Sequence, residues 1–399
     1  MMNAETFRRF VDKEYQLNHW ANTQRDAARK KPAVTAGMIF KACVFQAVLG
    51  IKSVLELDQK GRTKALRNLL GNDRDIATGS DSTILRAASA WDMGPLMEAG
   101  YGLHSMARKG HGWTTLSTGR QVRLAVEDGS CFGGHWGSVL AFSGAVPHAL
   151  DMEPYQKRGK ELPASRPLMI RAARRLGRGF ATHLLYDGLM MCRADFRLAR
   201  RLGMHLLVKT SEEKSLEIIA SSKEAWTKLS ERDMERAGVE TARGYDSQRH
   251  VRYSLRAQAG IRWEGLQYPL KVAWVKETHL KGKYAGETFS FWVVTTDETL
   301  TPEELREMAH NRWTIENHQF KELNFQTGSK DGYIKNSHAK EAFLRMGFLG
   351  LTLLKAFRLH LETLDEWRSW TVKKTKRLVA QVILFGIPNG EALNVPAPP

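Results

Sequence analysis

The chain of 399 residues is 42% hydrophobic, so it is long enough for two or three domains with a sizeable buried core. Its formal net charge of +17 favours a polyanionic partner, with nucleic acid as the leading class. Cys43, Cys131 and Cys192 lie far apart without a C-x-x-C spacing, which argues against a disulfide framework and zinc fingers but leaves a carboxylate-bound metal open.

Residues 1–115 have helical periodicity, a basic character and no strand pattern. Their most apolar stretch, residues 37–57, is interrupted by two lysines and a glutamine, so it predicts a buried core helix rather than a transmembrane span. Asp81 or Ser82 is the expected N-cap of a later helix in this block. Residues 1–15 carry acids and no apolar run, which argues against a signal or transit peptide and favours a cytoplasmic protein.

Short strands alternate with helix between about residues 120 and 210, as in a mixed α/β domain. Two of these strands run into an Asp-Gly pair, at Asp128 in "VRLAVEDGS" and at Asp187 in "THLLYDG". Since Asp-Gly is a favoured turn dipeptide, a turn explains either aspartate taken alone. Both, however, are expected at the carboxyl ends of strands, the edge of an α/β sheet where ligands bind.

A β-rich segment, which we interpret as an insertion, follows up to about residue 300 and ends in alternating strands. It contains Trp274 and Trp292, for which two interpretations exist. Either side chain is able to stack on a base flipped out of DNA, but the period-2 spacing around each favours core packing.

A helix is expected to begin at Thr301, because Thr301 suits the N-cap, Pro302 suits the first helical position and Glu304 completes a capping box. On this helix Glu316 stands four residues after Arg312, a spacing that an ordinary surface ion pair also explains. Further apolar helices follow, and the tail "NVPAPP" is expected to be disordered.

Asp128, Asp187 and Glu316 together supply three carboxylates, enough to hold two divalent ions close together. Such a pair activates an oxygen nucleophile on one side of a phosphodiester and stabilises the leaving oxygen on the other. This chemistry suits a strongly basic protein that acts on DNA.

The order of these motifs resembles a known family. "AVEDGS", then "LLYDGLMMCRADFRLARRLGMHLLVKTSE", a long β insertion and "NRWTIENHQFKELN" are similar to the DDE-class bacterial insertion-sequence transposases, in particular the superfamily of the insertion sequence numbered four. The resemblance implies an α/β fold with a ribonuclease-H-like catalytic core. The implied parts are a helical basic DNA-binding domain (1–115), the core in two parts (116–211 and 301–360), a β-strand insertion (212–300) and a C-terminal helix and tail (361–399).

The resemblance further implies a DNA transposase that cleaves at transposon ends and joins them to target DNA. Asp128, Asp187 and Glu316 would bind two Mg²⁺ ions, with Mn²⁺ as a substitute, and Arg312 would hold a DNA phosphate. The implied partners are double-stranded DNA and a second copy of the chain in the synaptic complex, without a membrane, in a bacterial cytoplasm at the nucleoid.

The chain departs from the family signature at two positions, where Ala309 replaces a tyrosine and Leu323 replaces a lysine. Lys321 is the nearest substitute for that lysine as a phosphate contact, although an offset of five residues from Glu316 rotates it well around an α-helix. His310, beside the missing tyrosine, is interpreted as a surface or packing residue.

Other charged groups have ordinary interpretations. Asp151, Glu153 and Glu161 lie in a mixed-charge, loop-like stretch, where a solvated surface is favoured over metal ligation. The run "RAARRLGRG" has two open interpretations, contact with a DNA backbone or the wet face of an amphipathic helix. Its arginines are Arg171, Arg174, Arg175 and Arg178.

Two alternative functions stay open. The first is a ribonuclease-H-like DNA nuclease that stops at hydrolysis, which joining of pre-cut end DNA to a plasmid would distinguish from a transposase. The second is a catalytically idle DNA-binding descendant of a transposase, which would retain DNA without any metal-dependent cleavage.

Overall fold

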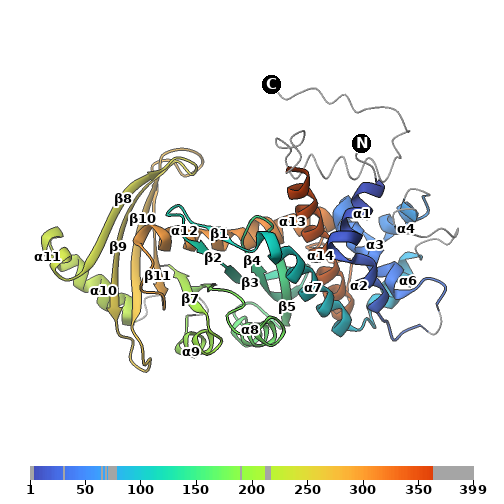
Figure 1. Cartoon of the computed structure of the whole chain (residues 1–399), viewed down its shortest axis with the longest axis horizontal. Helices are drawn as coiled ribbons and strands as arrows, with labels where there is room; N and C mark the ends of the chain where they lie inside the picture. Colours follow the sequence, from blue (N-terminus) through green and yellow to red (C-terminus); the bar gives the residue numbers. More distant parts are fainter. Residues whose placement is uncertain are drawn as a thin grey trace, which may run out of the picture.

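The computed structural model describes residues 4–29, 32–63, 66–67, 70, 79–188, 191–211 and 217–362. It places a helical bundle at one end, a sheet flanked by helices in the middle and a long antiparallel ribbon at the other end (Figure 1). The expected final helix and the expected disordered tail both lie outside the described residues.

The helical character expected for the first 115 residues is confirmed. In the described residues of this block the helices are α1 (Ala4–Tyr15), α2 (Leu17–Thr23), α3 (Ala36–Leu49), α4 (Val54–Gly61), α6 (Asp81–Ala88) and α7 (Met93–His111). The expected cap of α6 at Asp81 or Ser82 is wrong, because the hydroxyl of Ser80 accepts the bond from Thr83 N. Ser80 has the extended backbone of an N-cap residue, whereas Asp81 and Ser82 already belong to the first turn.

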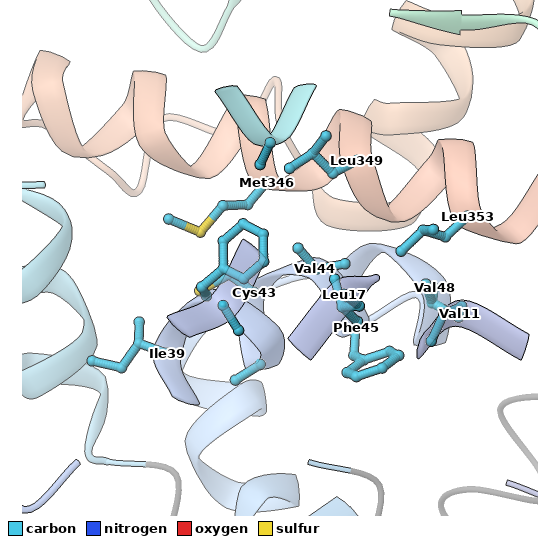
Figure 2. Packing of buried hydrophobic residues seen from close by; sticks show 14 of the residues in the cluster. Val11, Leu17, Ile39, Cys43, Val44, Phe45, Val48, Met346, Leu349 and Leu353 are labelled. Carbon is cyan, nitrogen blue, oxygen red and sulfur yellow. The ribbon is translucent and has the colours of Figure 1, made fainter. Parts of the chain in front are cut away.

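Helix α14 (Ser337–Glu362), the last helix of the described residues, completes the core of this N-terminal bundle. Figure 2 shows Val44 and Val48 of α3 close to Leu349 and Leu353 of α14. Glycine at 350 permits the close approach, since an added Cβ would lie 2.2 Å from the carbonyl oxygen of Val44. The first and last described parts of the chain therefore share one hydrophobic core.

A nine-stranded mixed sheet forms the centre and the ribbon, in the order β5-β4-β3-β6-β7-β11-β10-β9-β8. Strands β3, β6 and β7 are parallel neighbours, and the other pairs are antiparallel. The strands are β3 (Leu124–Phe132), β4 (His135–Phe142), β5 (His148–Tyr155), β6 (His183–Asp187), β7 (His205–Thr210), β8 (Val239–Asp246), β9 (Val251–Ile261), β10 (Leu270–His279) and β11 (Thr288–Thr295). A separate hairpin pairs β1 (Thr114–Thr115) with β2 (Gln121–Val122).

The strands expected of the insertion extend the same sheet, because β11 pairs antiparallel with β7. Strand β1 of the separate hairpin was not expected from the sequence, and neither were two strands of the large sheet. They are β5, in the stretch interpreted as loop-like, and β8, in a stretch of mixed charge. Strands β5 and β8 are the two edges of the sheet, and the alternation of half-exposed and exposed side chains in β8 carries little apolar signal.

Helices cover both faces of the central sheet. Those on one face include α8 (Leu162–Leu176), α9 (Arg193–Arg201) and α10 (Glu217–Lys228), with α11 (Glu231–Arg236) beside β8. The other face packs against α12 (Pro302–Ile315), the π-helical segment η2 (Glu316–Lys321), α13 (Glu322–Thr327) and part of α14. The predicted capping box at Thr301 is confirmed, with Thr301 and Glu304 bonding each other's backbone N–H.

Candidate active site

Strand periodicity places two aspartates on the sheet face that α12 covers. Val126 of β3 and Leu185 of β6 both pack into the core on that face. Since side chains two residues apart share a face, Asp128 and Asp187 follow them on the same side. The parallel pairing of Val126 with Leu185 brings the two aspartates to the same level.

Both Asp-Gly pairs were interpreted as possible turns. That interpretation is wrong at Asp128, whereas at Asp187 the strand does end and the carbonyl oxygen of Gly188 accepts from Met191 N at 3.3 Å in a turn. Gly129 lies inside β3, which continues to Phe132, and neither glycine has a positive φ. The glycines are required by close packing instead: an added Cβ would lie 2.5 Å from Tyr155 Oη at Gly129 and 2.3 Å from Thr210 Oγ1 at Gly188. Asp128 is therefore a mid-strand residue, while Asp187 is the last residue of β6, as expected.

Arg312 of α12 brings the third carboxylate to the pair. Its Nη1 lies 2.9 Å from Asp128 Oδ2, 3.4 Å from Glu316 Oε1 and 4.0 Å from Asp187 Oδ2. The three carboxylates thus converge on one guanidinium, whose side chain is only 15% exposed. The ion pair expected from the spacing of Glu316 and Arg312 is present. It is part of a larger cluster, because Arg312 also contacts Asp128 and Asp187.

Each aspartate directs one carboxylate oxygen toward this centre. Asp128 Oδ1 accepts from Gly129 N at 2.9 Å, and Asp187 Oδ1 accepts from Gly188 N at 2.6 Å, which leaves both Oδ2 atoms facing Arg312. Burial raises the pKa of Asp128 to about 7 against the opposing effect of Arg312, and the negative charges of Asp187 and Glu316 add to the rise. The site therefore concentrates more negative charge than one arginine neutralises.

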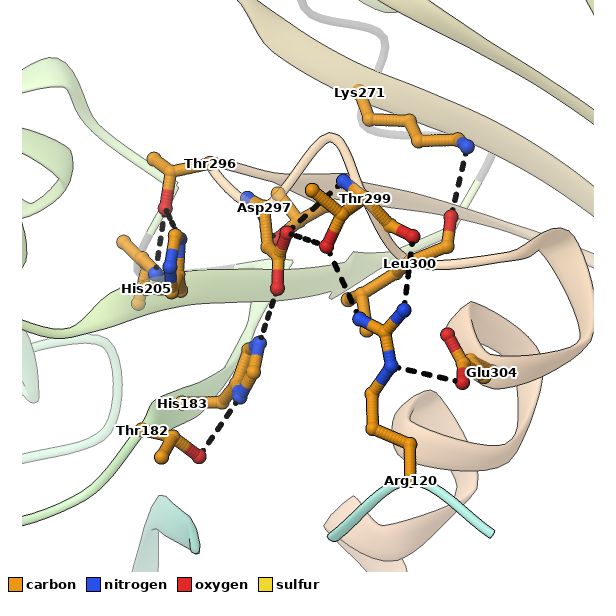
Figure 3. Close-up of polar contacts among 12 residues, drawn as sticks. Arg120, Thr182, His183, His205, Lys271, Thr296, Asp297, Thr299, Leu300 and Glu304 are labelled. Atoms are coloured by element: carbon orange, nitrogen blue, oxygen red, sulfur yellow. Dashed lines mark hydrogen bonds and ion pairs between the residues drawn. The ribbon is translucent and has the colours of Figure 1, made fainter. Parts of the chain in front are cut away.

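A polar network holds the beginning of α12 against the central strands (Figure 3). His183 Nε2 lies 2.9 Å from Asp297 Oδ2 in the loop before α12. Arg120 contacts Thr299 Oγ1 at 3.1 Å and Glu304 at 3.1 Å. Because these contacts join that loop to β6 and to the β1–β2 hairpin, they fix where α12 presents Arg312.

Glu316 begins the π-helical segment rather than ending a regular α-helix. A π turn closes hydrogen bonds between residues five apart, so Lys321 lies nearer to the face of Glu316 than α-helical geometry predicted. Lys321 does not join the acid cluster; its Nζ donates to Asn317 Oδ1 at 2.7 Å. The expected role of Lys321 as a phosphate contact stays a prediction.

Sequence reasoning missed a cation beside the cluster. Lys209 of β7 pairs in register with Asp187, and its Nζ lies 4.5 Å from the ring centroid of Trp313 and 4.0 Å from that of Phe291. Burial, and after it the positive charge of Arg312, lowers the pKa of Lys209 to about 8. Lys209 lies near the end of the strand next to the one that ends in Asp187, and this position is the sequence signal that could have identified it.

The two residues that differ from the signature of the resembled family both pack in the core. Ala309 and Leu323 are both fully buried in the core beneath α12. His310 is also buried and its Nε2 lies 2.7 Å from Glu277 Oε1, which confirms the packing interpretation of this histidine.

Burial lowers the pKa of His310 to about 4, against the opposing effect of Glu277. The unfolded chain binds this proton near pH 6.5 and the native chain does not, so stability is present above pH 6.5 and is lost as the pH falls toward 4. Protonation of His310 alone should therefore lower the free energy of unfolding of the wild type by about 2 kcal/mol between pH 7 and pH 5. Urea unfolding at both pH values should show that His310→Gln, which keeps a donor for Glu277, removes this part of the loss; an unchanged pH dependence would contradict the assignment.

The interpretation of Asp151, Glu153 and Glu161 as a solvated surface is wrong for two of them. Asp151 and Glu161 are 5% and 8% exposed, while Glu153 accepts from Arg171 Nη1 at 2.9 Å. Asp151 accepts from Arg171 at 2.6 Å and from Arg345 at 2.6 Å. These partners come from α8 and α14, so only the tertiary fold neutralises the buried carboxylate.

The arginine run matches neither open interpretation completely. Arg171 is half-buried in the Asp151 network, Arg175 pairs with Glu98 at 2.5 Å on the surface, and Arg174 and Arg178 are exposed. Core packing is confirmed for Trp292, which is fully buried and stacks on half-buried Trp274 at 5.6 Å between ring centroids.

The donor chemistry of the acid cluster fits hard divalent cations, since all three groups offer carboxylate oxygens. No group of three or more His, Cys, Asp or Glu side chains in the described residues is already arranged as a metal-ligand set. Arg312 lies between the three acids, so a cation bound by them competes with its guanidinium. Asp128, Asp187 and Glu316 are the residues that would hold Mg²⁺ or Mn²⁺.

Comparisons with known proteins give a distant structural likeness. No family model matches the sequence, and no curated protein matches it. Among solved structures, a chain from the cryo-EM structure of a piggyBac transposase synaptic complex with hairpin DNA is 9% identical, with a TM-score of 0.47 over 98% of this chain and 83% of that chain. At this distance the likeness establishes neither a shared family nor a shared activity.

A membrane span requires a long apolar helix, which the described residues do not supply as a single element. None of their helices is by itself both long and apolar enough to cross a bilayer; only α3 and α4 taken together, with a bend of 105° between them, reach that length and composition.

Proposed function

We propose that the chain is a DNA transposase that cleaves phosphodiester bonds at the ends of a mobile element and joins the freed ends to target DNA. The observation that carries the proposal is the convergence of Asp128, Asp187 and Glu316 on Arg312 over the sheet face that α12 covers. The net charge of +17 supports DNA as the substrate. The antiparallel β5-β4-β3 unit, continued by parallel β6 and β7, supports a ribonuclease-H-like core.

The mechanism assigns separate tasks to the residues of the site. Two divalent ions, when bound, supply activation of the attacking oxygen and stabilisation of the leaving oxygen. Asp128 and Asp187 hold their oxygens in fixed directions through their bonds to the following backbone N–H groups. Arg312 offers a planar guanidinium that suits bidentate contact with a phosphate oxygen pair. Strand transfer then uses the freed 3′-hydroxyl as the nucleophile, without a covalent protein intermediate.

Arg312 provides a test of the metal assignment that does not depend on catalysis. Removing a positive charge within 4.0 Å of all three acids should raise their affinity for divalent cations by about tenfold. Titration of Arg312→Ala and wild type with Mn²⁺, followed by electron paramagnetic resonance, measures this change. Cleavage by Arg312→Ala should nevertheless fall, and Arg312→Lys should restore only part of it. Equal Mn²⁺ affinity in the two proteins would place cation binding elsewhere.

A nuclease is the second candidate, favoured by the same carboxylates. Incubating wild type with pre-cut end DNA, a circular plasmid and Mg²⁺ separates the two functions. The transposase proposal predicts joined products with a 3′-end of the donor covalently attached to the plasmid. Hydrolysis without joined product would favour the nuclease.

A further inference from the structure

A cavity of about 390 Å³ opens beside η2, away from the acid cluster side chains. Two parts of the chain that are far apart in sequence line it: the α3–α4 connection, and the continuous stretch from the η2–α13 helix into the α13–α14 connection. Their lining side chains are Lys52, Lys321, Asn324, Phe325, Lys330 and Asp331. The cavity therefore lies between the N-terminal bundle and the segment that carries Glu316.

The charge of this cavity suits an anion. Lys52, Lys321 and Lys330 are all exposed, and in the described part of the chain none of them forms an ion pair with a carboxylate. Asp331 is the single acid among the lining residues, so three ammonium groups face one carboxylate. Each ammonium can neutralise one backbone phosphate.

An exposed aromatic ring shares the cavity with these lysines. Phe325 is 58% exposed, and Lys52 Nζ lies 5.8 Å from its ring centroid. An exposed aromatic ring beside cations is an arrangement that proteins use to bind single-stranded nucleic acid, with the base stacked on the ring and the backbone held by charge. A base inside a duplex has both faces covered by its neighbours, so the ring fits an unpaired base.

Backbone packing fixes the shape of the cavity wall. Gly328 has φ +60°, and a Cβ added there would lie 3.0 Å from the carbonyl oxygen of Lys52 and 2.6 Å from Asp331 Oδ2. Asn324 Oδ1 accepts from Lys330 N at 2.7 Å. The lysines are thus held on adjoining, tightly packed segments.

Resting on the proposed function, we propose that this cavity binds an unpaired nucleotide of the DNA strand that leads away from the acid cluster. Lys321 is five residues beyond Glu316, which is about one turn of the π-helical segment, so the two residues lie on neighbouring turns of the same face. A strand held at Glu316 is therefore within one or two nucleotides of Lys321. The phosphates contact Lys52, Lys321 and Lys330, and the base stacks on Phe325.

The test measures binding in a background expected not to cleave. Asp128→Asn protein is titrated into fluorescein-labelled single-stranded oligothymidine and into a blunt duplex, with anisotropy as the readout. Adding Phe325→Ala should weaken single-strand binding about tenfold and leave duplex binding within twofold. Adding Lys52→Ala with Lys330→Ala should reduce the slope of log Kd against log salt for the single strand by about 1.4.

Two neighbouring changes serve as controls, and both should leave single-strand binding within twofold. Leu55→Ala removes an exposed apolar side chain without a ring, and Lys60→Ala removes an ammonium already paired with Glu56 at 2.5 Å. Unchanged single-strand affinity in Phe325→Ala, or an equal loss on the duplex, would overturn the nucleotide assignment, and an unchanged salt slope would overturn the phosphate contacts. Because no cleavage is measured, a wild type that binds DNA but never cuts it contradicts only the proposed function.

Discussion

Replacing Asp128 by asparagine is expected to lower metal-dependent DNA cleavage by on the order of 10³-fold or more, since a bound cation contributes several kcal/mol to the transition state. Asp187→Asn and Glu316→Gln should act alike, because all three carboxylates converge on the same centre. DNA affinity should stay within a few-fold, because backbone neutralisation uses other residues. Gel analysis of cut strands and anisotropy on the same preparations measure both quantities.

Glu307→Gln is the matched control for these three variants. Glu307 is a carboxylate of the same helix α12, but it bonds the backbone N–H of Ser117 and does not face the cluster. Its cleavage rate should stay within twofold of wild type. Near-normal cleavage by any one of the three cluster variants would remove that residue from the site.

The second large effect concerns stability. Arg345→Met should lower the free energy of unfolding by about 3 kcal/mol, because it removes one of the two arginines that neutralise buried Asp151. Burial acts to raise the pKa of Asp151, but Arg345 and Arg171 outweigh burial and hold that pKa below its ordinary value. Urea denaturation midpoints at pH 7, compared at equal m-values, measure the loss.

Arg175→Met provides the surface comparison, because the Arg175–Glu98 pair is 50% and 39% exposed. A pair this open should contribute less than about 1 kcal/mol. If the Arg345 and Arg175 variants lost equal stability, the buried network would not hold β5 between α8 and α14.

The sequence predicted those parts of the fold whose signals are local. Apolar alternation identified β3, β6 and β7, and the capping box at Thr301 identified the beginning of α12. Strand β5 was missed because the sequence around Asp151 and Glu153 is typical of a solvated loop. Their partners Arg171 and Arg345 belong to other elements, α8 and α14. Burial of charge depends on partners that no local pattern contains.

The acid cluster was predictable only in part. Chain order and strand ends indicated Asp128, Asp187 and Glu316, but their convergence depends on how β3, β6 and α12 pack. Arg312 lies between the three acids rather than beside Glu316 alone, and this position depends on the tertiary packing of α12 against the strands. Lys209 was missed because the apolar run of β7 indicates a buried strand, and a lysine near the end of such a strand is common at a protein surface.

We expect metal-dependent cutting and joining of DNA at the cluster of Asp128, Asp187 and Glu316. Its most direct measurement uses a plasmid that carries the reading frame with its natural flanking DNA, incubated with purified protein and Mg²⁺, followed by mapping of every new 3′-end. We predict 3′-hydroxyl ends at a pair of inverted repeats bracketing the frame, and their absence with Asp128→Asn or with chelator. Identical 3′-end maps for wild type and Asp128→Asn, with DNA binding intact in both, would contradict the account.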